Sequence, residues 1–295
     1  MMRIGAQVPM AGGALCALEY AMAAGCETMQ IFAKSPRRWA GPAQDPRAAE
    51  AFRNACAEAA FGPVFTHASY LINMGSEDDA LWERSAAALA DEAVRAHGLG
   101  AAGLVVHLGR RFSDDDAESV ARVTACAVRA YEIAGDSAAR LLLENSAGAG
   151  WQFGVSVPEC AAALVSVRAA GIEAALCFDT CHGFAGGIDV RCADGWREAL
   201  RELSALAGAG AIALVHANDC RGEFGARKDR HEWIGDGLIG RDGFAAMFEQ
   251  RGLAGASVVV EMPGDGPHKD EENVSRLKAL RDAAAASAVP DPARA

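Results

Sequence analysis

Six short apolar runs of the chain each end in a histidine or a carboxylate. These six residues are His67, His107, Glu144, Asp179, His216 and Glu261. An ionisable side chain at the end of a buried segment is unfavourable unless it is paired or binds an ion. One such residue would more simply be a hydrogen-bonded histidine or acid of the core. Six of them, on segments that can lie side by side, favour a shared metal-binding site.

Three further candidate ligands lie just beyond these runs. His182 follows Asp179 by three residues, and Asp229 and His231 are separated by one residue. In a loop, the second spacing lets both side chains turn toward the same ion. The whole set has five histidines and four carboxylates, a mixture that favours zinc, or alternatively manganese or iron, over magnesium or calcium. Nine ligands exceed what one or two ions need, and they suit three ions that share a carboxylate.

The nine cysteines are an odd number and form no C-x-x-C pair. Cys177 and Cys181 flank Asp179 and could supply thiolate ligands, but oxygen and imidazole ligands already crowd this segment. We therefore expect most cysteines to be small apolar packing residues, reduced in a cytoplasmic protein.

The hydrophobic pattern of the sequence alternates between predicted strands and predicted helices, and these elements must position the candidate ligands. The apolar runs predict strands at 3–8, 28–32, 64–67, 103–107, 140–144, 174–179, 211–216 and 257–261. The Ala-rich stretches between them predict helices, including those at 80–96, 117–133, 196–207 and 243–250. Eight alternating units in 295 residues predict a single (β/α)8 TIM barrel, with an open doubly wound sheet as the alternative. In a barrel, the carboxyl ends of the strands meet on one face, where the six strand-end ligands would converge.

The rest of the chain adds three expectations. The barrel domain spans 1–286, and the tail at 287–295, which contains two prolines, is expected to be disordered. The segment at 218–240 is long, irregular and rich in glycine and charge, which is more often functional than idle in a compact domain. No apolar run reaches the ~18 residues of a membrane span, and the N-terminus does not resemble a signal peptide.

The net charge of −11 opposes a nucleic-acid partner at long range, although local patches decide binding and bound metal ions would offset the acids. A multi-metal site at a barrel mouth suits phosphodiester hydrolysis, because two close ions can activate a water and clamp both oxygens of an in-line displacement. Sugar isomerisation or epimerisation, which uses metals to bind adjacent hydroxyls, is the alternative.

Several segments match a known family. They are IGAQVPMAGG at 4–13, FAKSPRRW at 32–39, SYLINMG at 69–75, LENSAGAG at 143–150, CFDTCHGFAGG at 177–187, HANDC at 216–220, DRHEWIGDGLIG at 229–240 and VVVEMP at 258–263. With these motifs, nearly the whole chain resembles the endonuclease IV family of zinc-dependent apurinic/apyrimidinic endonucleases.

The resemblance implies a role for each ligand. His67, His107 and Glu144 would hold one zinc ion. Glu144 would bridge to a second ion, completed by Asp179, His216 and Glu261, and the third would be held by His182, Asp229 and His231. In this family a zinc-held hydroxide attacks the phosphate 5′ to an abasic sugar in duplex DNA, which leaves a 3′-hydroxyl and a 5′-deoxyribose phosphate. No organic cofactor is implied, and we expect a monomer.

The resemblance also implies contacts with DNA. Arg37, Tyr70 and Leu71 would enter the helix at the lesion, and the abasic nucleotide would swing into the metal pocket. Arg227, Lys228 and Arg230 form a short basic run beside the third metal group, which we interpret as phosphate-contacting. The alternatives are a loop packed on its own barrel for Tyr70 and Leu71, and solvated surface charges for the basic residues.

The chain departs from the family pattern at four positions. Gln7 replaces a histidine, Pro9 replaces a residue with a hydroxyl and an N–H donor, Ala68 replaces an acid, and Trp233 replaces a smaller polar residue. None of these is among the nine ligands. They leave room for a paralogue with altered or weaker activity. A relative that binds DNA without cutting it is a separate alternative, against which the complete set of nine ligands argues.

Overall fold

Eight parallel strands close into a barrel in the computed structural model, which describes residues 1–263 and 266–287. Their order around the barrel follows the chain, and the last strand pairs with the first. The strands are β1 (Ile4–Gln7), β2 (Thr28–Ile31), β3 (Val64–His67), β4 (Gly103–His107), β5 (Leu141–Glu144), β6 (Ala174–Asp179), β7 (Ile212–His216) and β10 (Ser257–Val260). The closure confirms the predicted (β/α)8 barrel and excludes the open sheet.

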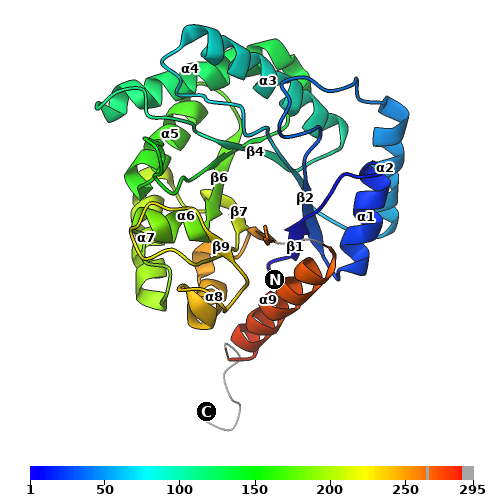
Figure 1. Ribbon diagram of the computed structural model, residues 1–295, viewed down its shortest axis with the longest axis vertical. Helices are drawn as coiled ribbons and strands as arrows, with labels where there is room; N and C mark the ends of the chain where they lie inside the picture. The colour runs from blue at the N-terminus through cyan, green and yellow to red at the C-terminus, as the bar shows by residue number, and fades with distance from the viewer. Residues whose placement is uncertain (264–265, 288–295) are drawn as a thin grey trace.

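Helices surround the barrel as an outer ring (Figure 1). They are α1 (Ala14–Ala23), α2 (Pro46–Glu58), α3 (Asp79–Gly98), α4 (Asp116–Ala134), α5 (Val157–Ala169), α6 (Thr180–Gly186), α7 (Ala193–Ala207), α8 (Gly240–Phe248) and α9 (His268–Ser287), with short 3₁₀ turns at Gly135–Ser137 and Arg251–Leu253. Several begin as capping predicts, because the side chains of Asp45, Asp78, Asp115 and Ser156 accept hydrogen bonds from backbone amides of the first turn. Among the described residues, no helix is both long and apolar enough to span a bilayer.

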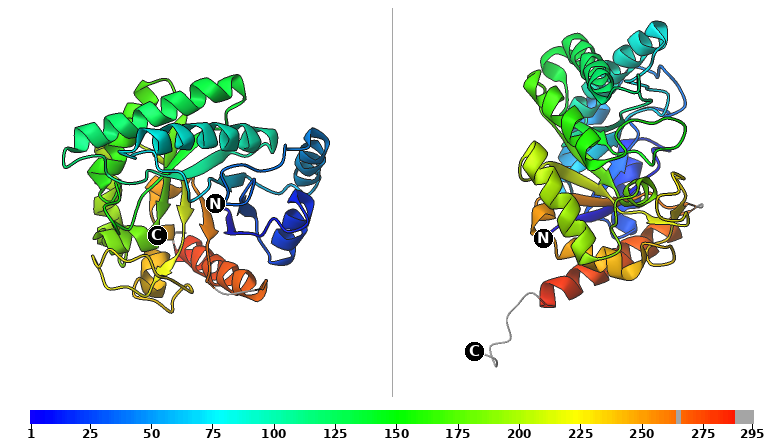
Figure 2. Two further views of the ribbon diagram at one scale, coloured as in Figure 1. Left: turned by 45° about the horizontal axis from the view of Figure 1, so that its top comes forward. Right: turned by 90° about the vertical axis from the view of Figure 1, so that its left-hand side faces the viewer.

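The predicted strand bounds match at β3, β4 and β6, and each of the other five is one or two residues shorter than predicted. The segment at 218–240 is less irregular than expected, because β8 (Asp219–Cys220) and β9 (His231–Glu232) pair in it as an antiparallel hairpin. In the right-hand view of Figure 2, this yellow segment projects from the edge of the barrel opposite to the N-terminus. Of the predicted tail at 287–295, only Ser287, the end of α9, lies within the described residues.

The core has two parts. A large cluster lies between the barrel and its helices. A smaller apolar plug fills the barrel interior, and its residues are Phe65, Val105, Leu142, Ala175, Cys177, Leu214 and Val259. Because side chains alternate along a strand, the residue two positions after a plug residue points to the same side of the sheet. In six strands that next inward position is one of the predicted ligands.

Candidate metal centre

The structure brings all nine predicted ligands to the carboxyl ends of the strands. His67, His107, Glu144, Asp179 and His216 are the last residues of β3 to β7, and Glu261 directly follows β10. Asp179 also caps α6 by accepting a hydrogen bond from the His182 amide at 2.7 Å, which fixes His182 beside it. The β8–β9 hairpin folds back and carries Asp229 and His231 over the same face. All of these ligands except Asp179 and His216 line a cavity of about 340 Å³, and Gln7, Tyr70, Met262 and Lys269 also line it.

Glu144 lies at the centre of the first two ligand groups. Its Oε2 is 3.1 Å from His67 Nε2 and 3.5 Å from His107 Nδ1. Its Oε1 is 3.2 Å from His216 Nδ1, which is in turn 3.3 Å from Glu261 Oε2. The two oxygens of one buried carboxylate therefore face two different sets of ligand atoms, as a bridging carboxylate would.

The third group gathers around Asp229. Its Oδ2 lies 3.4 Å from His182 Nε2 and its Oδ1 lies 3.1 Å from His231 Nε2. Asp179 approaches the same histidine, with Oδ2 at 3.7 Å from His231 Nε2. Cys181 also reaches this group, because its Sγ is 4.0 Å from Asp229 Oδ1, whereas Cys177 lies in the apolar plug.

Four of the five histidine rings are oriented by a hydrogen bond on one nitrogen, which leaves the other nitrogen facing a carboxylate; His182 Nδ1 also lies 3.3 Å from Glu144 Oε1. The four pairs are His67 Nδ1 with Ala68 O at 2.7 Å, His182 Nδ1 with Asn145 O at 3.0 Å, His231 Nδ1 with Glu261 O at 3.1 Å and His216 Nε2 with Gln30 Oε1 at 3.0 Å. Such a second hydrogen bond fixes the tautomer and the orientation of metal-binding histidines. The remaining nitrogens are thereby presented to the cavity.

The residues fit a divalent cation. His107 Nδ1 and His231 Nε2 are buried and have no hydrogen-bond partner among the described residues. They nevertheless lie 3.5 and 3.1 Å from carboxylate oxygens. Two atoms that each bind one tetrahedral zinc ion at ~2.0–2.1 Å are ~3.3 Å apart. These separations are therefore those of ligands that share an ion.

The pKa values of the ionisable groups also indicate that positive charge is favoured in the site. Burial lowers the pKa of His107 to about 4, so this ring is neutral at pH 7 and ready to bind a metal. Burial would also lower the pKa of His231, but Asp229 and Asp179 raise it to about 9. Burial raises the pKa of Asp179 above its ordinary value, because the surrounding histidines compensate only part of the desolvation. Metal ions can therefore replace the protons that the histidines would otherwise carry beside these carboxylates.

Three residues that support the site were not anticipated. Gln30 Nε2 donates to Glu261 Oε1 at 3.2 Å, and its Oε1 accepts from His216 Nε2. Asn218 Nδ2 donates to Asp179 Oδ2 at 2.7 Å, and its Oδ1 accepts from the Glu261 amide at 2.8 Å. Asn145 donates to the Asp179 carbonyl and accepts from its amide. Asn145 directly follows Glu144 and Asn218 lies two residues after His216, so their positions next to ligands were the available signal.

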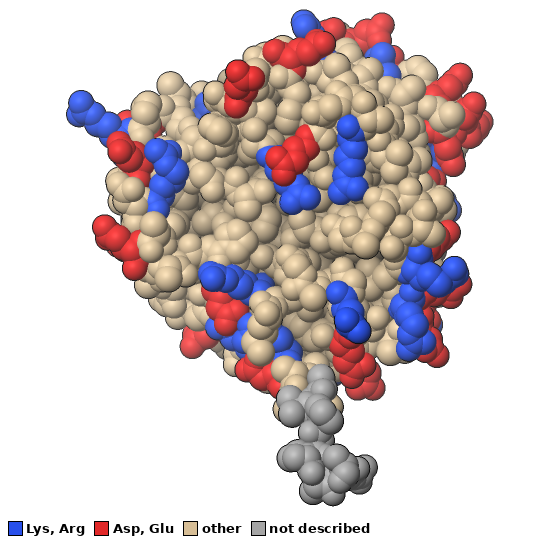
Figure 3. Space-filling view, turned by 180° about the vertical axis from the view of Figure 1, so that it is seen from behind, with Lys and Arg blue, Asp and Glu red and all other residues tan. Residues whose placement is uncertain are grey.

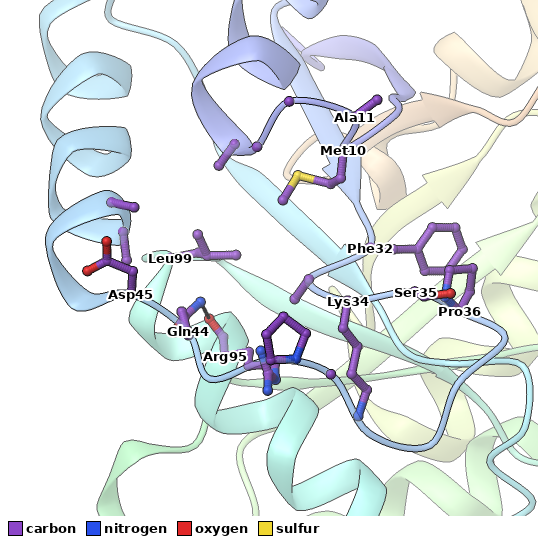
Figure 4. A pocket seen from close by; sticks show the side chains of 18 of the residues that line it. Met10, Ala11, Phe32, Lys34, Ser35, Pro36, Gln44, Asp45, Arg95 and Leu99 are labelled. Atoms are coloured by element: carbon purple, nitrogen blue, oxygen red, sulfur yellow. Dashed lines mark hydrogen bonds between the residues drawn. The ribbon is translucent and has the colours of Figure 1, made fainter.

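The predicted DNA contacts from the early part of the chain lie on loops of the same face. Arg37 is exposed on the loop between β2 and α2. Lys34 anchors this loop, because its buried Nζ donates to Asp91 at 2.7 Å and to the Trp39 carbonyl at 3.0 Å. Figure 4 shows the cavity of about 600 Å³ between this loop and the turn after β1. The Pro36 carbonyl accepts a hydrogen bond from Ser69 Oγ at 2.7 Å, so the loop that carries Arg37 is also tied to the loop after β3.

Tyr70 and Leu71 follow β3. Tyr70 is 58% exposed, and its ring packs edge-on against Phe32, with 5.4 Å between ring centroids, and in a tilted arrangement against His67, with 5.7 Å between centroids. Leu71 is partly buried, and its amide donates to Ser69 Oγ at 3.3 Å. The pair therefore lies next to a ligand of the first group and still presents the tyrosine to solvent.

The basic run beside the third group is also exposed. Arg227, Lys228 and Arg230 form no ion pair with a carboxylate among the described residues. On the opposite face of the molecule, basic residues are interspersed with acidic ones (Figure 3). The unpaired cations of the β8–β9 region therefore remain available to an anionic partner on the side of the metal centre.

Gln7 and Trp233, two of the departures from the family pattern, lie in different surroundings. Gln7 lines the cavity, and its buried Oε1 has no hydrogen-bond partner among the described residues. The Trp233 ring instead packs against α9, where it lies 5.6 Å from His268 and stacks with Arg276 at 5.7 Å. Trp233 therefore holds the hairpin on the barrel, while Gln7 is free to contact a bound group.

Comparisons with known proteins agree with this geometry. Residues 18–284 match the family model described as a xylose isomerase-like TIM barrel. A probable endonuclease 4 from Methanoculleus marisnigri is 38% identical over 95% of this chain and 99% of its own length. The crystal structure of endonuclease IV from Thermus thermophilus superposes with a TM-score of 0.81 at 35% identity, covering 95% of this chain and 99% of the other. A D-tagatose 3-epimerase-like protein has a TM-score of 0.72 at 19% identity, covering 98% and 100%, which shows a shared fold alone.

Proposed function

The chain belongs to the endonuclease IV family, and from this premise we propose that it is a metal-dependent DNA-repair endonuclease that cuts duplex DNA at abasic sites. The product would carry a 3′-hydroxyl and the 5′-deoxyribose phosphate. We propose a monomer that needs no organic cofactor.

One observation carries this proposal, namely that Glu144 lies between two ligand groups while a third group adjoins them. We propose zinc as the ion, with His67, His107 and Glu144 holding the first. Glu144, Asp179, His216 and Glu261 would hold the second, and His182, Asp229 and His231 the third. When bound, such ions would supply a water acidic enough to act near neutral pH and a Lewis acid for the charge that develops on the phosphate.

The protein's own residues would do the rest. The hydrogen bonds to Ala68, Asn145, Glu261 and Gln30 keep four of the histidine rings in place without substrate, so little reorganisation would accompany binding. Arg37, Tyr70 and Leu71 would hold the duplex at the lesion, and Arg227 and Arg230 would contact phosphates. Because base loss has already removed stacking, extrusion of the nucleotide into the cavity costs least at an abasic site.

A sugar isomerase or epimerase is the second candidate, because proteins of those names share the fold. The third ligand group disfavours it, since binding two adjacent hydroxyls needs one or two ions. A DNA-binding relative without activity is disfavoured by the complete set of nine ligands. Both alternatives remain open to a direct assay.

The test is incision of a labelled duplex that carries one tetrahydrofuran abasic analogue, with an undamaged duplex as the control. We expect a single cut 5′ to the analogue, which is lost after chelation and restored by zinc. If protein with a full metal content leaves the damaged duplex intact, the proposed activity is wrong. Turnover of a ketose under the same conditions would favour the epimerase.

A further inference from the structure

Trp151 is an exposed aromatic residue on the loop between β5 and α5, at the same end of the barrel as the metal centre. Its side chain is 48% exposed. Its backbone φ is 68°, in the left-handed region that a tryptophan rarely occupies and that is unfavourable for it. Single exposed hydrophobic residues are common, so the residue needs further support before it indicates a partner.

Backbone hydrogen bonds anchor the loop on both sides of Trp151. The Trp151 carbonyl accepts a hydrogen bond from the Arg111 amide at 2.8 Å, and Gln152 forms a β-bridge with Arg110. The fully buried Phe153 donates to the Gly109 carbonyl at 3.0 Å. The backbone is thus fixed on both sides of Trp151, and the indole is held outward.

Two neighbouring arginines differ in their partners. Arg111 forms ion pairs with Asp116 and Glu159, and its guanidinium lies over the Phe153 ring. Arg110 is exposed and forms no ion pair with a carboxylate in the described parts of the chain. The first arginine therefore stabilises the loop, and the second leaves a free cation directly across the bridge from Gln152.

The loops at this side of the mouth are joined to those already proposed to contact DNA. The Arg110 amide donates to Asn73 Oδ1 at 2.8 Å, which ties it to the loop that carries Tyr70. On the other side, the loop after β5 adjoins the loop that carries Arg227, because a Cβ atom placed on Gly148 would lie 3.4 Å from Arg227 Cδ. Green and yellow loops project from one edge of the barrel in the right-hand view of Figure 2. The exposed groups therefore form an arc from Tyr70 through Arg110 and Trp151 to Arg227.

We propose that Trp151 stacks on a nucleotide of the DNA substrate and that Arg110 pairs with a backbone phosphate, so that the footprint extends over the loops after β4 and β5. An aromatic face that stacks on a base, combined with an unpaired cation for the phosphate, is the chemistry by which proteins hold nucleic acid without reading its sequence. This inference rests on the proposed endonuclease function and adds binding residues to it.

The test separates binding from chemistry for the zinc-loaded protein on the tetrahydrofuran duplex. We expect Trp151→Ala to raise KM about tenfold, within the range of base–aromatic stacking, and to leave kcat within about twofold. Trp151→Phe should recover most of the loss, because it keeps a stacking face. The thermal unfolding midpoint of Trp151→Ala should not fall, whereas a purely structural role for Trp151 would lower it.

Arg110→Ala provides the second test. The slope of log(kcat/KM) against log salt should fall by about one, as expected for one lost phosphate contact. Arg201→Ala, which removes an exposed arginine of α7, is the matched control and should keep the slope of the parent protein. If the parent protein cuts and both Trp151→Ala and Arg110→Ala behave like it, the footprint inference is wrong and the endonuclease proposal stands. If the parent protein does not cut, the proposed function fails, and binding of the same duplex by fluorescence anisotropy then tests the two residues alone.

Discussion

Two neighbouring layers inside the barrel are built by the same strands but differ in what completes them. In six strands an apolar residue of the plug is followed two positions later by a predicted ligand. The pairs are Phe65 and His67, Val105 and His107, Leu142 and Glu144, Cys177 and Asp179, Leu214 and His216, and Val259 and Glu261. The apolar layer needs no bound group, because its side chains fill the space between the strands by packing against one another. The polar layer holds buried nitrogens that have no hydrogen-bond partner in the described part of the chain, so it is complete only with cations.

The difference shows that residues two positions apart on the same strands can serve stability and function separately. The apolar layer lies farther from the carboxyl ends of the strands and is called the lower layer here, and the polar layer is called the upper layer. Each buried leucine of the lower layer contributes about 1.5–3 kcal/mol by leaving water. In the upper layer the same burial disfavours charge, and it raises the pKa of Asp179. Substitutions in the two layers should therefore produce opposite patterns of damage.

The largest effect is expected for Glu144→Gln. This change keeps the size of the side chain but removes the negative charge that faces His67, His107 and His216. Incision should fall at least about a thousandfold, of the order that follows loss of a principal electrostatic group. Zinc content, measured by atomic emission, should fall by about two ions per chain. Full cleavage by this variant would show that Glu144 does not bridge two ions.

Leu142→Ala, one inward position lower on the same strand, should give the converse result. Loss of a fully buried leucine should lower the free energy of unfolding by about 2–5 kcal/mol, which urea denaturation of the zinc-loaded protein can measure. Zinc per folded chain should remain that of the parent protein. A loss of zinc at a temperature where the variant is folded would mean that the two layers are not separable.

A smaller effect is expected for Asn218→Ala, because Asn218 is not itself a candidate ligand but supports two of them. The asparagine holds Asp179 and Glu261 by hydrogen bonds, and loss of such support lowers metal affinity by about 10- to 100-fold. Competition with a zinc chelator would measure the change. Gln44→Ala, which removes a side-chain hydrogen bond to the Arg95 carbonyl far from the ligands, is the control and should leave affinity unaltered.

The smallest effect on the metal centre is expected for Arg37→Ala. The side chain is exposed and is not one of the nine candidate ligands, so zinc content should be unchanged. Incision of the tetrahydrofuran duplex should weaken by about tenfold through KM, as loss of a DNA contact predicts. If zinc is lost from this variant, the assignment of its loop to DNA contact is mistaken.

The fold and the nine candidate ligands could be predicted because both depend on patterns among residues that are close in the sequence. An apolar run gives the strand, and the residue that interrupts it marks the strand end, as at His107 and Glu144. What could not be predicted depends on contacts between distant segments. Gln30 supports His216, which lies 186 positions later, and only closure of the barrel joins them. The β8–β9 hairpin was also missed, because two-residue strands leave no periodic pattern.

The central claim is that the polar layer holds three metal ions in one site. Anomalous diffraction at the zinc absorption edge, from crystals of the zinc-loaded protein, tests it most directly. We predict three peaks. One should lie among His67, His107 and Glu144, one among Glu144, Asp179, His216 and Glu261, and one among His182, Asp229 and His231. Fewer than three peaks in this layer, or peaks only on the outer surface, would contradict the account.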